Sequence, residues 1–143
     1  MDGPSGALRQ TQGMATPSTT TAPRPHPVHS ALVELTSLGV LLQALWAGLF
    51  LRRGDQGTWV SVHQHAGETT VLLGVLAAVA ALIWLRDNRP VLVGTLLLAV
   101  LLVVELVLGY TIDGGGAAVV VHVPLAMLLM GLAVWLPTAA RRS

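Results

Sequence analysis

The chain has 143 residues, of which 53% are hydrophobic and only 10% are charged. Soluble domains carry about 25% charged residues, so these few charges cannot cover a water-facing surface. The composition therefore excludes most soluble enzymes, nucleic-acid binders and secreted scaffolds. Cysteine is absent, which excludes disulfides, thiolate metal sites and covalently attached c-type haem. The net charge of +1 gives no indication of a nucleic-acid partner.

Residues 1–29 differ in composition from the rest of the chain. This stretch is rich in Pro, Thr, Ser and Gly and has little that could form a core, so we predict a disordered tail. It lacks the apolar segment of a signal peptide. The first apolar run is too long for such a segment and is followed by Arg52 and Arg53. We therefore expect it to be retained as the first helix.

Four apolar runs follow the tail, and each has about the 20 helical residues needed to cross a hydrocarbon core of ~30 Å. They cover residues 31–51, 59–85, 91–110 and 117–136. Because short connections rich in Gly, Asn or Pro separate them, consecutive helices should pack as antiparallel neighbours. We therefore predict an all-α membrane protein, an up-down four-transmembrane-helix bundle over residues 30–138. The disordered tail precedes it, and a short C-terminal tail follows at residues 139–143.

The arginines indicate how the bundle is oriented. With four spans, both termini and the second connection share one side of the membrane. That side holds Arg9, Arg24, Arg86, Arg89, Arg141 and Arg142, and the other holds Arg52 and Arg53. The positive-inside rule then places both termini in the cytoplasm. Every basic residue is Arg rather than Lys, which is typical of GC-rich bacterial genomes, so we expect a multi-pass protein of the bacterial inner membrane.

Ionisable side chains inside a membrane span are costly, and their default interpretation is functional. The spans contain Glu34, His65, Glu68, Glu105 and His122, with His63 nearer the predicted outer end. At about 1.5 Å per residue, His65, Glu105 and His122 each lie about 8–9 Å from that end. Three helices thus place an ionisable side chain at one level.

Only one of the two neighbouring histidines on the second helix can face the interior. His63 and His65 are two residues apart, so their side chains point about 200° away from each other on a helix. His65 shares its face with Glu68, one turn further on, and with Leu72. We therefore expect His65 to face inward and His63 to lie closer to water.

Three interpretations of this level follow. A b-type haem needs two neutral imidazoles on opposite sides of the porphyrin, which His65 (or His63) and His122 would supply from different helices. Glu68 and Glu105 would then orient the imidazoles. Alternatively, the same residues form interhelical hydrogen bonds without a cofactor, each worth roughly 0.6–2 kcal/mol. A third alternative is a metal ion held by the His and Glu side chains.

The histidine motifs resemble those of a known family. The sequence Val62-His63-Gln64-His65-Ala66-Gly67 opens a long apolar helix, Leu106-Val107-Leu108-Gly109 ends the next, and Val121-His122-Val123-Pro124-Leu125-Ala126 follows. Over residues 60–136 the chain resembles one four-helix half of the haem A synthase family of membrane haem proteins. It is also similar to small bacterial four-helix membrane proteins with the same two histidine positions. The resemblance implies that His65 (or His63) and His122 ligate haem.

A full synthase has two such halves, whereas this chain has one, so we do not expect it to oxidise haem. We expect a small membrane protein that binds one b-type haem near the outer leaflet, for electron transfer or haem handling, with no bond-making chemistry of its own. The alternative is a non-enzymatic structural or accessory subunit. The lipid bilayer is one expected partner, and a membrane protein or a second copy of the chain is another.

Overall fold

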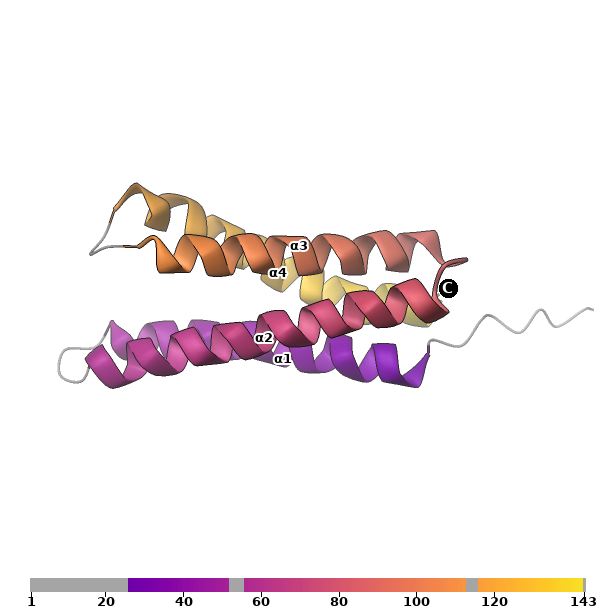
Figure 1. Ribbon diagram of the computed structural model, residues 1–143, viewed down its shortest axis with the longest axis horizontal. Helices are drawn as coiled ribbons and strands as arrows, with labels where there is room; N and C mark the ends of the chain where they lie inside the picture. Colours follow the sequence, from indigo (N-terminus) through magenta and orange to yellow (C-terminus); the bar gives the residue numbers. More distant parts are fainter. Residues whose placement is uncertain (1–25, 52–55, 113–115, 143) are drawn as a thin grey trace, which may run out of the picture.

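The computed structural model describes residues 26–51, 56–112 and 116–142, and everything it describes outside short turns is helical. The helices are α1 (Pro27–Phe50), α2 (Gln56–Trp84), α3 (Arg89–Tyr110) and α4 (Ala117–Arg142), which run antiparallel to one another in sequence order (Figure 1). All four are long and apolar enough to cross a membrane. The predicted all-α, four-helix fold is therefore confirmed for the described residues.

The helix ends differ from the predicted ones by more than two residues at three places. Helix α1 begins at Pro27, four residues early, because proline is favoured in the first helical turn and His26 serves as the N-cap. Residues 27–29 therefore belong to the helix and not to the predicted tail, while residues 1–25 lie outside the described residues. Helix α2 begins at Gln56. Helix α4 continues through Pro137 to Arg142, beyond its predicted end at residue 136.

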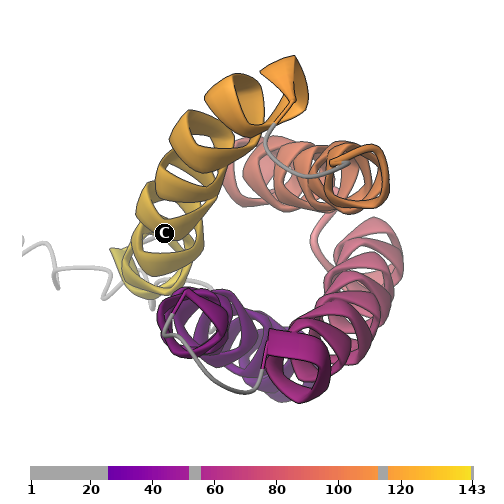
Figure 2. The ribbon, with the colours of Figure 1, turned by 90° about the vertical axis from the view of Figure 1, so that its left-hand side faces the viewer.

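The four helices are arranged in a ring. Each packs against its neighbours in sequence, and α4 packs against α1 to close the bundle. The view along the bundle shows this order directly (Figure 2). Helices α2 and α4 therefore lie on one diagonal of the bundle and α1 and α3 on the other, as expected for an up-down topology.

The packed core occupies one half of the bundle. We call the end where α1 and α3 begin the proximal end, and the end where α2 and α4 begin the distal end. The core consists of Val33, Val40, Ala77, Leu98, Leu102, Leu129, Ala133 and Leu136. Among the described side chains, no fully buried one lies distal to Val40 on α1, Thr70 on α2, Leu102 on α3 or Leu129 on α4.

The helices diverge towards the distal end, where the α1–α2 pair separates from the α3–α4 pair (Figure 1). In the packed half of the bundle, close approach depends on small residues. A Cβ atom at Gly39 of α1 would lie 2.5 Å from Thr70 Oγ1 of α2, and one at Gly74 would lie 2.5 Å from Leu102 Cδ1 of α3. Small residues that let backbones approach are typical of helix packing in membranes.

The outer surface of the bundle is apolar. Large side chains such as Leu72, Val93, Val107 and Met127 are more than half exposed. A contiguous apolar surface of this kind would aggregate in water, but it matches a lipid environment. Together with the lengths of the helices, it defines the chain as a multi-pass α-helical membrane protein.

Candidate functional site

Polar side chains from all four helices gather at the distal end. They are Gln43 on α1, His63 on α2, Glu105 on α3 and His122 on α4, all of them partly buried. We call these residues the distal polar site. It lies in the half of the bundle that has no fully buried residue among those described, so the site occupies the part where the helices diverge.

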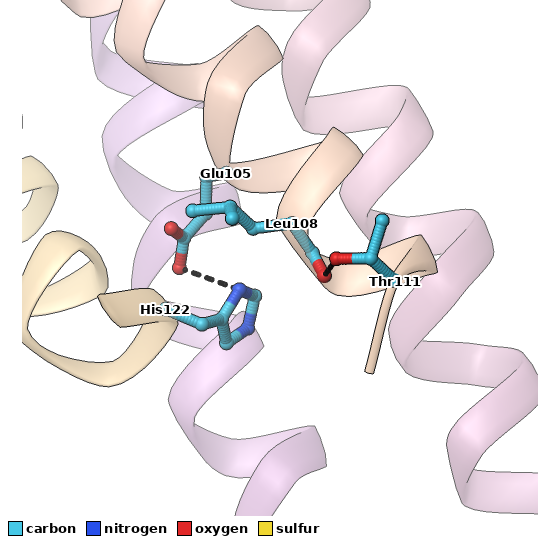
Figure 3. Close-up of polar contacts among 4 residues, drawn as sticks. All are labelled: Glu105, Leu108, Thr111 and His122. Atoms are coloured by element: carbon cyan, nitrogen blue, oxygen red, sulfur yellow. Dashed lines mark hydrogen bonds and ion pairs between the residues drawn. The ribbon is translucent and has the colours of Figure 1, made fainter. Parts of the chain in front are cut away.

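The clearest contact in the distal polar site joins α3 to α4. Glu105 Oε1 lies 3.2 Å from His122 Nδ1, and the two side chains are only 13% and 17% exposed (Figure 3). A carboxylate beside Nδ1 favours the tautomer that carries its proton there, which leaves the lone pair on Nε2. Glu105 and His122, which the sequence analysis paired, therefore lie at ion-pair distance. The same view shows the Thr111 hydroxyl donating to the Leu108 carbonyl at the end of α3.

His63 is the histidine of α2 that faces the interior. It is partly buried, and it hydrogen-bonds to the backbone of Gln43 on α1. His122 is also partly buried and lies on α4, the helix diagonally opposite α2. The distal polar site therefore contains two imidazoles, one from each helix of this diagonal.

The expectation that His65 faces inward is wrong. His65 is exposed, and its Nδ1 donates to the backbone carbonyl of Ser61, 2.8 Å away on the same helix. The reason lies in the stripe of small residues that faces the interior. Counting back from the buried Ala77 in steps of three or four gives Gly74, Thr70, Gly67 and His63. His65 falls outside this stripe.

Glu68 does not orient a histidine. Its carboxylate is exposed and accepts a hydrogen bond from the Tyr110 hydroxyl of α3. The predicted pairing of Glu68 with His65 is therefore wrong, because Glu68 shares the outward direction of His65 and meets the end of α3 instead. Tyr110 had no predicted role, since its partner depends on how α2 and α3 are packed.

Two glycines lie beside the distal polar site. A Cβ at Gly67 would lie 3.7 Å from Leu106 Cδ1 and 3.8 Å from Gln43 Nε2, and a Cβ at Gly109 would lie 3.5 Å from His122 Cε1. Both positions therefore face neighbouring helices and add no side chain there.

The proximal end holds a second polar group that the sequence analysis overlooked. His29 is 1% exposed, and its Nε2 lies 3.0 Å from Thr95 Oγ1 on α3. His26 stacks on Trp84 of α2 with ring centroids 4.0 Å apart. Both histidines fell in the predicted tail. Pro27, a favoured residue in the first turn of a helix, was the signal that α1 includes His29.

Three or more His, Asp or Glu side chains grouped for metal binding are not found in the part of the chain that the structure describes. The chain matches no protein-family model, no curated protein and no solved structure. The class defined by the fold is that of a multi-pass four-helix membrane protein, and its distal polar site is the feature from which a function can be argued.

Proposed function

We propose that the protein binds one b-type haem at the distal end through His63 and His122, for electron transfer or haem handling. The observation that supports this most strongly is that α2 and α4, which lie on one diagonal of the bundle, each carry a partly buried histidine at the distal end. A bis-histidine haem needs ligands from two sides of the macrocycle. The resemblance to the haem A synthase family adds the same expectation, with His63 now preferred over His65.

The packing of the bundle fits a flat ligand at this end. The distal halves of the helices contribute no fully buried side chain among those described, and the buried core lies in the proximal half. Gly109 places no side chain next to His122, and Gly67 places none next to Gln43. Ligand sites in four-helix bundles are built in this way, from side chains that project inward from facing helices.

Glu105 would position His122 as a ligand. Its carboxylate holds Nδ1 and leaves Nε2 for the iron, which is the usual arrangement around a metal-binding histidine. A bound haem would supply one-electron redox chemistry. The contribution of the chain would be to hold and orient the group and to limit its contact with water.

The arginines support an orientation for this site. Arg86 and Arg89 flank the proximal connection between α2 and α3, whereas Arg52 and Arg53 follow α1 at the distal end. Arg141 and Arg142 at the end of α4 add to the positive charge of the proximal end. Because this end has more arginines, the positive-inside rule favours placing it in the cytoplasm. We accordingly propose that the protein lies in the bacterial inner membrane, with the haem near the outer leaflet.

The test is an optical spectrum of the protein purified in detergent from haem-replete cells. The proposal predicts a b-type Soret band that is absent in His122→Ala, while circular dichroism shows that the variant keeps its helices. A colourless wild-type protein with full helical content would overturn the proposal.

The Glu105–His122 contact also favours a second function, a structural or accessory subunit in which this pair links α3 to α4 without a cofactor. Interhelical contacts of this kind contribute roughly 0.6–2 kcal/mol in membranes. The same purification separates the two functions, because the structural alternative predicts a colourless protein that loses stability in His122→Ala. A metal ion held by His and Glu stays a prediction, tested by elemental analysis of that sample.

A further inference from the structure

The proximal end contains a pair of histidines that the proposed haem site does not use. His26 is the N-cap of α1, and His29 lies three residues further on, so the two share one face of the first turn. Thr95 of α3 contacts one ring and Trp84 of α2 contacts the other. Three helices thus fix the positions of these imidazoles.

The hydrogen bonds around His29 determine which nitrogen carries its proton. A threonine hydroxyl has one proton, and Thr95 donates it to the Val91 carbonyl, 2.8 Å away. The Thr95 oxygen must then accept, so His29 donates from Nε2 over 3.0 Å. The neutral ring therefore has its lone pair on Nδ1. That atom is buried and has no hydrogen-bond partner among the described residues.

The Nδ1 atom of His26 is in the same situation as that of His29. The His26 ring stacks on the Trp84 indole with an interplanar angle of 6°, which fixes the orientation of the ring. Its Nδ1 is likewise buried and without a hydrogen-bond partner in the described part of the chain. Buried polar atoms normally have a partner, and each exception calls for an explanation. Here two exceptions of the same kind occur one helical turn apart.

We propose that His26 and His29 bind a divalent first-row transition metal ion through their Nδ1 atoms. Imidazole nitrogen is a preferred ligand of copper, nickel and zinc ions. A metal-binding histidine usually donates its other ring N–H to a fixed acceptor, as His29 does to Thr95. Water or a further ligand completes the coordination of the ion. The site is independent of haem, because it uses neither His63 nor His122.

The test is a Cu²⁺ titration of the full-length protein in detergent, purified with a tag that contains no histidine. Electron paramagnetic resonance should report one copper site with hyperfine coupling from two imidazole nitrogens. Losing an outer partner of a metal ligand weakens binding by about 10–100-fold, so we expect Thr95→Val to weaken Cu²⁺ binding in that range. Removing a ligand directly, in His29→Ala, should weaken it by more than about 100-fold.

His26→Phe protects the test against misfolding, because phenylalanine keeps an aromatic ring for Trp84 while it removes the nitrogen. We expect a folded variant with the same large loss of copper affinity. His65→Ala is the matched control, because His65 is exposed and lies outside both sites, and it should retain copper binding. Wild-type affinity in folded His26→Phe would overturn the proposal, as would loss of the copper signal in His65→Ala. Failure of haem binding would leave both results unchanged.

Discussion

The close approach of α1 and α2 at Gly39 makes a quantitative prediction. A Cβ at this position would lie 2.5 Å from Thr70 Oγ1, 3.0 Å from Cγ2 and 3.2 Å from Cβ. Rotation of the Thr70 side chain cannot relieve all three contacts, because its own Cβ is among them and its hydroxyl donates to the Ala66 carbonyl. Gly39→Ala must therefore move one helix away from the other, and overpacking of this kind costs about 1–3 kcal/mol.

Replacing glycine by alanine within a helix also has a favourable contribution of about 0.5–1 kcal/mol. We therefore expect Gly39→Ala to lower the free energy of unfolding by up to about 2.5 kcal/mol, the difference between these two effects. Gly48→Ala is the matched control, because it lies on the same helix with no atom within 4 Å of the added Cβ. It should leave stability equal to or above that of the wild type.

The assay is reversible unfolding in detergent micelles, followed by far-ultraviolet circular dichroism. Both variants are measured with the wild type under identical conditions, so that only differences are interpreted. If Gly39→Ala is as stable as Gly48→Ala, the helices do not approach each other as described, and the account of the proximal core is refuted.

Three further predictions concern the distal contact, the core and the orientation. Glu105→Leu leaves His122 Nδ1 without its carboxylate neighbour and should lower the free energy of unfolding by about 1–3 kcal/mol. Glu105→Gln keeps an acceptor and should lower it less. Equal losses in unfolding experiments would argue against the contact. Leu129→Ala removes a fully buried side chain and should lower the free energy of unfolding by about 2–5 kcal/mol. Met127 is exposed, so Met127→Ala should change stability little. A larger loss in Met127→Ala than in Leu129→Ala would contradict the assigned core. A cysteine at Gly116 should react with a membrane-impermeant thiol reagent from the periplasmic side of intact cells, and labelling only from the cytoplasmic side would reverse the orientation.

The four spans were predictable because lipid restricts the backbone to few conformations. A backbone inside lipid must satisfy its own hydrogen bonds, so a long apolar run with few charges forms a helix. Glu105 and His122 could also be paired from the sequence, since the antiparallel topology places them at one depth. The beginning of α1 was misplaced because Pro27 follows a Pro-rich stretch that composition assigns to a tail.

The direction of each side chain around its helix could not be derived from hydrophobicity. In a membrane both the interior and the lipid face of a helix are apolar, so the choice between His63 and His65 depends on the small residues that line the interior. The stripe through Gly67, Thr70 and Gly74 carries that information. The partnership of Glu68 with Tyr110 needs the packing angle of α2 against α3, which no single helix encodes.

The most direct test of the proposed haem site compares alanine variants at two positions that lie two residues apart on α2. His63→Ala and His65→Ala are purified from haem-replete cells, and the Soret absorbance per protein is measured against the wild type. Because His63 is partly buried in the distal polar site, whereas His65 is exposed and bonds to its own helix, we predict that His63→Ala loses the b-type spectrum and His65→Ala retains it. Loss of the spectrum in His65→Ala with retention in His63→Ala would contradict the account.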